Sequence, residues 1–174
     1  GGKNVQKIGA GINEKVVRSE PLSDFDIIAI ATHGVQSNEF LEINEPALLL
    51  PFASSSEQDG YDGALLASEI AQLDLNAELV LLSACNTAYG DQDYNETLSG
   101  LTSSFLIAGA KSLIVSNWAI DSKSTPDFTT EIFNILLKDE TLTVPKALQL
   151  ATKKIRSQGF DHPFYWASLS YAGR

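Results

Sequence analysis

Three short runs of apolar and small residues constrain the fold of this chain more than any other feature. They read FDIIAIATHG over residues 25–34, ELVLLSA over 78–84 and KSLIVSNW over 111–118. Apolar runs of this length, without regular polar alternation, are typical of strands that are covered on both faces, as in parallel sheets. We therefore predict three buried strands at the centre of the fold.

Helical patterns follow the second and third of these runs. Apolar residues recur at helical spacing from Thr97 to Ala108, and proline stands near the start of the segments at 124–138 and 143–159. Gly109 and Gly159 occupy places where helices commonly end. Buried strands that alternate with helices indicate βαβ units. The sequence therefore predicts an α/β fold with a mostly parallel central sheet and helices on both faces.

Four shorter segments complete the predicted elements. We expect a short helix within 12–20, a hairpin arm or edge strand within 46–53, a second short helix around 67–73 and a final strand within 163–173. Tyr165 and Trp166 are expected to pack that last strand.

The composition is that of an ordinary globular protein. The 174 residues are 44% hydrophobic and 20% charged, and no apolar stretch approaches the roughly 20 residues that a membrane span needs. A net charge of −10 disfavours nucleic acid as a partner. A single cysteine cannot form an internal disulfide, so we expect a reducing, cytoplasmic location. We interpret residues 1–23 as a tether or partial element and 24–174 as one domain.

Two of the predicted strands end in residues with reactive side chains. The first ends at His33 and Gly34, and the second leads into Cys85. In a parallel sheet such strand ends meet at one edge, where an imidazole can take the thiol proton and the thiolate can attack a carbonyl. The main-chain amides of Gly34 and Cys85 are candidate donors to the developing oxyanion. The separation of 52 residues (85 minus 33) is near the value of about 50 seen in caspases.

Less specific interpretations remain open on these residues alone. A lone cysteine is commonly a small core residue, and a His-Gly pair after a strand is as readily a turn. The other histidine, His162, follows Cys85 by 77 residues (162 minus 85), well short of the roughly 130–150 of papain-like enzymes.

Four motifs stand in order along the chain: ATHG (31–34), LASEIAQLDLNAELVLLSACNTAYG (66–90), SGLTSSFLIAGAKSLIVSNWAID (99–121) and HPFYWASLSYAG (162–173). Together they resemble the CHAT family, caspase-like cysteine peptidases that are related to separase and often fused to tetratricopeptide repeats. The resemblance implies a caspase-like three-layer fold, His33 and Cys85 as the catalytic dyad, and the amides of Gly34 and Cys85 around the oxyanion. It implies no metal and no cofactor.

Three further residues are candidates for substrate binding. Asp121 follows the third strand, where an acidic side chain would select a basic residue before the scissile bond, although a surface or helix-entry role is the alternative. Trp118 is a candidate wall of the same pocket or a core residue, and Asn86 adjoins the cysteine. The caspase signature Q-A-C-[RQG]-G is absent, so aspartate specificity is not expected.

The expected function is that of a cysteine endopeptidase that cleaves a specific protein partner under the control of an attached tetratricopeptide-repeat or sensor region. The alternatives are a catalytically silent signalling or scaffold module and a thiol-dependent acyl transferase or hydrolase. Members of the family usually have a further strand and helix before the histidine strand. We therefore expect that this chain is the C-terminal section of a longer protein or packs against a companion segment.

Overall fold

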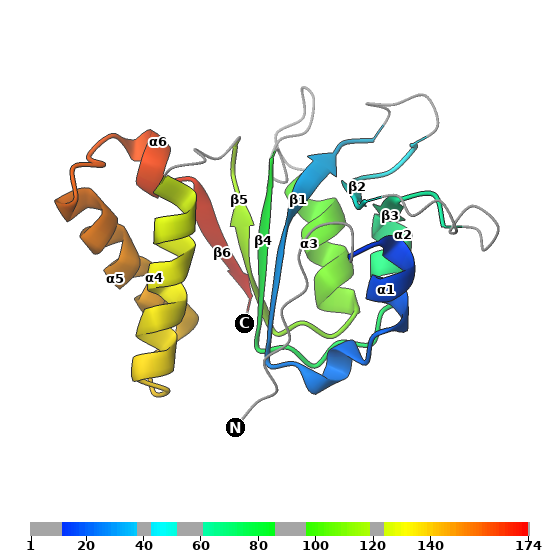
Figure 1. Cartoon of the computed structure of the whole chain (residues 1–174), viewed down its shortest axis with the longest axis horizontal. Coiled ribbons are helices and arrows are strands. Elements are labelled where there is room, and N and C mark those ends of the chain that lie inside the picture. The colour runs from blue at the N-terminus through cyan, green and yellow to red at the C-terminus, as the bar shows by residue number, and fades with distance from the viewer. Residues whose placement is uncertain (1–11, 38–42, 52–60, 86–96, 119–123, 174) are drawn as a thin grey trace.

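Six strands form one mixed sheet in the computed structural model, which describes residues 12–37, 43–51, 61–85, 97–118 and 124–173 (Figure 1). The sheet order is β3-β2-β1-β4-β5-β6. The strands are β1 (Ile27–Val35), β2 (Ala47–Leu49), β3 (Ala64–Leu66), β4 (Leu79–Cys85), β5 (Ser112–Ser116) and β6 (Leu169–Gly173). The helices are α1 (Glu14–Ser19), η2 (Leu22–Asp24), α2 (Ala67–Ile70), α3 (Thr97–Ile107), α4 (Ser124–Lys138), α5 (Val144–Ser157) and α6 (Pro163–Trp166).

The three apolar runs of the sequence become the centre of this sheet. β1 pairs in parallel with β4, and β4 pairs in parallel with β5. The flanking strands are antiparallel, since β2 pairs with β1 and with β3, and β6 pairs with β5. The predicted parallel arrangement therefore holds for the long central strands, and short antiparallel strands extend the sheet on either side.

Helices cover both faces of the sheet, which confirms the predicted α/β class and its three layers. One face packs against α1, α2 and α3, and the other against α4, α5 and α6 (Figure 1). Alternate residues of β4 point to opposite faces. Val80 and Leu82 belong to the core beneath α2 and α3, whereas Leu79 and Leu81 belong to the core beneath α4 and α5.

Two glycines end helices as the sequence predicts. Gly109 follows α3 with φ +113°, and Gly159 follows α5 with φ +95°. Both values lie in a region that side chains disfavour and glycine tolerates. Gly109 also lies against the main chain, because a Cβ there would be 2.1 Å from the carbonyl oxygen of Leu75.

The predicted final strand is too long at its start. Residues 163–166 form α6 instead, so Tyr165 and Trp166 are helical and do not lie in β6. Pro163 suits the first turn of a helix, and the imidazole Nδ1 of His162 accepts a hydrogen bond of 3.2 Å from the amide of Phe164. These local signals outweigh the β-favouring aromatic composition. A further strand, β3, was not predicted, and it has three residues.

The expectation that β1 is covered on both faces is wrong. Its residues alternate between exposed and half-buried as far as Gly34, and Ile27, Ala29 and Ala31 are exposed. The reason is tertiary: the core beneath α4 and α5 contains residues of β4, β5 and β6, and none of its described members belongs to β1.

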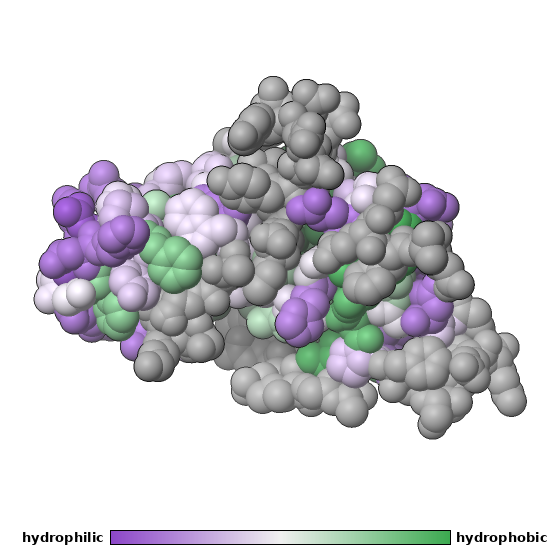
Figure 2. All heavy atoms as spheres, turned by 90° about the horizontal axis from the view of Figure 1, so that it is seen from above, coloured by the Kyte–Doolittle hydropathy of each residue, from purple (hydrophilic) through white to green (hydrophobic). Residues whose placement is uncertain are grey.

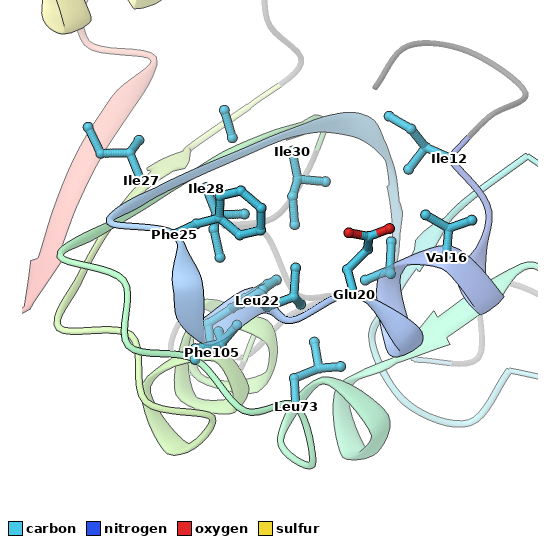
Figure 3. Close-up of a pocket in the computed structure, with 13 residues that line it drawn as sticks. Ile12, Val16, Glu20, Leu22, Phe25, Ile27, Ile28, Ile30, Leu73 and Phe105 are labelled. Carbon is cyan, nitrogen blue, oxygen red and sulfur yellow. The ribbon is translucent and has the colours of Figure 1, made fainter. Parts of the chain in front are cut away.

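One edge of β1 is also open along most of its length. β2 pairs with β1 only from His33 to Val35, so within the described part of the chain no strand borders residues 27–32 on that side. An apolar groove of about 170 Å³ lies along this edge. Figure 3 shows Ile28 and Ile30 on its β1 side, with η2, α1 and α3 contributing the opposite lining. A free edge with apolar surface beside it is a place where another segment can pair.

Candidate active site

The sheet places His33 directly beside Cys85. β1 and β4 pair from Ile27↔Leu79 to His33↔Cys85, with a constant offset of 52 residues. The separation of 52 residues between His33 and Cys85, which is near that of caspases, therefore equals the offset at which β1 pairs with β4. Adjacent strands lie about 4.8 Å apart, so the two main chains are neighbours at the carboxyl ends of both strands. The prediction that these two strands adjoin in the sheet is confirmed.

Alternate residues of a strand belong to the same face of a sheet, so the positions of His33 and Cys85 can be assigned to a face by counting along β1 and β4. Leu79 and Leu81 face the core beneath α4 and α5, and the register position of Cys85 continues that series. On β1 the same series contains the exposed residues Ile27 and Ala29 and ends at His33, whose side chain is exposed. An imidazole at this position is accessible to solvent.

β2 anchors the end of β1 that carries the histidine. The register pairs His33 with Leu49 and the half-buried Gly34 with Leu48. The hydroxyl of Thr32 donates a hydrogen bond to the carbonyl oxygen of Leu49, which ties the two strands together just before the histidine. The backbone on both sides of His33 is therefore held by β4 and by β2.

Ser116 supports the end of β4, and sequence reasoning did not single it out. Its side chain is fully buried, and its hydroxyl donates a hydrogen bond to the carbonyl oxygen of Ala84, the residue before Cys85. A polar residue at the end of an otherwise apolar run was the available signal, because a buried hydroxyl needs a partner.

Asn117 fixes the segment that follows β5, and it was likewise missed. Its main-chain N–H donates a hydrogen bond of 2.7 Å to the carbonyl oxygen of Ser168, and its side-chain nitrogen donates one of 2.9 Å to the carbonyl oxygen of Ala167. Its side-chain oxygen accepts from the hydroxyl of Ser170 at 2.9 Å. These bonds join the end of β5 to the start of β6, so the main chain that leads to Trp118 is held in place.

Trp118 follows the end of β5 by two residues. β4 and β5 pair from Val80↔Leu113 to Leu82↔Val115, and the hydroxyl of Ser116, the last residue of β5, bonds to the carbonyl oxygen of Ala84 beside Cys85. The half-buried indole donates a hydrogen bond of 3.1 Å to the carbonyl oxygen of Phe164 on α6. The tryptophan therefore contacts α6, and it belongs to none of the three core clusters of the described residues.

Two predicted substrate contacts lie outside the described residues. Asn86 follows β4 and Asp121 precedes α4, and the structure describes neither. In the described ranges, no cluster of three or more His, Cys, Asp and Glu side chains is arranged to hold a metal ion. No helix in those same ranges has the length and apolar character to cross a membrane.

The sequence profile of the CHAT domain matches residues 2–174. The chain belongs to the CHAT domain family. Among curated proteins, tetratricopeptide repeat protein 28 of Mus musculus is 31% identical over 110 residues, and the protein of the same name from Homo sapiens is 29% identical over 110 residues. Each alignment covers 63% of this chain and 4% of the relative. This CHAT domain therefore corresponds to a small part of those long proteins.

Proposed function

We propose that this CHAT domain is a cysteine endopeptidase of the caspase-like class. The observation that supports it most is the pairing of His33 with Cys85 at the carboxyl ends of adjacent parallel strands. That arrangement brings a proton acceptor and a nucleophile together on rigid backbone. Cys85 is the proposed nucleophile, and His33 is the proposed general base and acid.

The proposed reaction has two stages. His33 accepts the thiol proton of Cys85, and the sulfur forms a bond to the peptide carbonyl carbon, whose oxygen is held by the amides of Gly34 and Cys85. The C–N bond then breaks as His33 returns the proton to the leaving amine, which leaves a thioester. Water, deprotonated by His33, attacks the thioester, and the acid product and the free thiol are released.

We propose a single protein partner as substrate and control by an attached region. The curated relatives are named for tetratricopeptide repeats, which supports a repeat region in the same polypeptide as the regulator. Asp121 is the proposed determinant for a basic residue before the scissile bond, with Asn86 as a further substrate contact. A reducing cytoplasm is the proposed location, since Cys85 acts as a free thiol.

We also propose that an extended segment from outside the described residues pairs with the free edge of β1. Residues 27–32 have β4 on one side and an apolar groove on the other, and their exposed face is apolar as well. An unpaired strand edge presents backbone donors and acceptors that match another strand. The proposed occupant is therefore a strand with apolar residues, supplied by the longer polypeptide.

The peptidase proposal is tested by labelling Cys85 with a peptide acyloxymethyl ketone in the intact polypeptide that carries this domain. Mass spectrometry is expected to place the label on Cys85, and Cys85→Ala removes it. Loss of the base in His33→Ala is expected to slow labelling by about a hundredfold.

His162→Asn is the matched control for that experiment. His162 is exposed, and asparagine can accept the same capping hydrogen bond from the amide of Phe164, so the change is expected to leave the labelling rate unchanged. Labelling of the His33→Ala protein at the rate of the wild type would overturn the proposed dyad.

A further inference from the structure

Three aromatic side chains contact one another in series where the end of β5 meets α6. The rings of Trp118 and Phe164 are stacked, with centroids 6.5 Å apart and an angle of 20° between their planes. Phe164 also contacts Tyr165 edge to face at 5.4 Å. We call Trp118, Phe164 and Tyr165 the aromatic shelf. It joins the end of β5 to α6.

The shelf lies on the same side of the sheet as the proposed dyad. Trp118 follows Ser116 by two residues, and the hydroxyl of Ser116 donates to the carbonyl oxygen of Ala84, the residue before Cys85. Its partner Phe164 belongs to α6, which packs with α4 and α5 over the face to which the alternation assigns His33. Figure 2 views the molecule from above, looking toward the end at which β1, β4 and β5 finish.

The shelf is both rigid and accessible. The hydrogen bond from the Trp118 indole to the carbonyl oxygen of Phe164 sets the orientation of the indole, and Tyr165 packs in turn against Phe160 at 5.1 Å. Nevertheless 41% of Phe164 is exposed, which makes it one of the few large apolar side chains on the described surface. An apolar surface that is held in place and left uncovered is suited to bind another apolar group.

We propose that the aromatic shelf is a specificity subsite for a large apolar side chain of the peptide substrate, with Phe164 as its main determinant. This inference rests on the proposed peptidase function, because a peptide backbone must lie across Cys85. An extended peptide advances about 3.3 Å per residue. One strand spacing of about 4.8 Å plus the 6.5 Å between the rings is about 11 Å, which corresponds to a side chain about three residues from the scissile bond.

The test compares two peptides that differ at one position, leucine against alanine, scanned over the three residues on each side of the scissile bond. Binding to the Cys85→Ala form of the intact polypeptide is measured by isothermal titration calorimetry, so the result does not depend on turnover. At one position the leucine peptide is expected to bind about tenfold more tightly. Phe164→Ala is expected to remove that preference, and Phe164→Leu to retain most of it.

Leu137→Ala is the matched control, because Leu137 is an apolar residue of α4 that is 75% exposed. It is expected to leave the preference unchanged. Equal binding of the paired peptides at every position, or a preference that survives both Phe164→Ala and Trp118→Ala, would overturn the subsite. The peptidase proposal is decided separately, by measuring peptide cleavage by the wild-type protein, which has Cys85. A protein that shows the leucine preference but cleaves no peptide would support the subsite and contradict the peptidase proposal.

Discussion

At the scale of single residues, two buried serines on β5 make similar hydrogen bonds to opposite ends of β4, and only one of these bonds lies near Cys85. Ser112 donates a hydrogen bond to the carbonyl oxygen of Glu78 at the beginning of β4, and Ser116 donates to that of Ala84 at its end. Both side chains are buried on the same strand. One bond lies at the start of β4 and the other lies next to Cys85.

Replacing either serine by alanine is expected to lower the free energy of unfolding by about 1 kcal/mol, because each change removes a hydrogen bond that a buried hydroxyl makes to the main chain. Only Ser116→Ala is expected to slow labelling of Cys85 as well, since Ser116 positions the end of β4. Urea unfolding and labelling rates measure the two effects. Equal labelling rates in the two variants would remove the positioning role of Ser116.

Gly109 gives a second prediction at this scale. Gly109→Ala forces a Cβ to within 2.1 Å of the carbonyl oxygen of Leu75 and also strains a backbone of positive φ. We expect a loss of about 3 kcal/mol or more in the free energy of unfolding. Gly159→Ala is the control, because a Cβ there meets nothing within 4 Å and the cost is limited to backbone strain, about 1 kcal/mol. Equal losses in the two variants would contradict the clash.

At the scale of elements, α1 is fastened to the fold by a charged side chain. Glu14 is 2% exposed and accepts hydrogen bonds of 3.2 Å from the guanidinium of Arg18 and from the amide of Gly63. Arg18 also bonds to Glu69 on α2 at 2.6 Å. Burial lowers the pKa of Arg18, but the hydrogen bond to Glu14 and the charges of Glu69 and Glu14 raise it overall. The guanidinium therefore stays charged and keeps α1 attached to α2.

Glu14→Ala is expected to cost about 2 kcal/mol of unfolding free energy, because it leaves the Gly63 amide and one contact of Arg18 without their acceptor. Glu78→Ala is the comparison. Its ion pair with Lys111 joins two side chains that are each more than half exposed, so its loss is expected to change stability by less than about 0.5 kcal/mol. Chemical denaturation of both variants measures the difference. A small effect at Glu14 would show that α1 is held by its apolar contacts alone.

At the scale of the whole molecule, β4 is paired along both edges, whereas most of one edge of β1 has no neighbouring strand in the described part of the chain. β4 has a strand on each side and a helix layer on each face, whereas β1 has an open edge and an exposed apolar face along residues 27–32. This difference, together with the apolar groove, is what supports the proposed companion strand.

Hydrogen exchange tests the companion strand. In this chain alone, amides of residues 27–32 that point away from β4 are expected to exchange at least about a hundredfold faster than those of β5, because no strand of the described ranges pairs with them on that side. In the longer polypeptide the same amides are expected to become protected, while the amides of β5 stay unchanged. Fast exchange at residues 27–32 in both proteins would exclude a strand at that edge.

Local patterns predicted much of the fold and the place of the site. Apolar runs of strand length and the glycines after α3 and α5 were sufficient for the central strands and the long helices, because both signals act over a few neighbouring residues. The end-of-strand positions of His33 and Cys85 followed from the same runs. The boundary between α6 and β6 was missed, since aromatic composition competes there with Pro163 and the cap from His162.

The sequence by itself determined the α/β class, the order of the main elements and the pair of residues on which the proposed chemistry depends. Only the tertiary structure decided that the offset of 52 residues is a strand register, that Ser116 and Asn117 hold the neighbouring strand ends, and that one face of β1 stays exposed. The physical reason is range. Hydrophobic periodicity and helix capping are local, whereas register, burial and coverage depend on contacts between residues far apart in the chain.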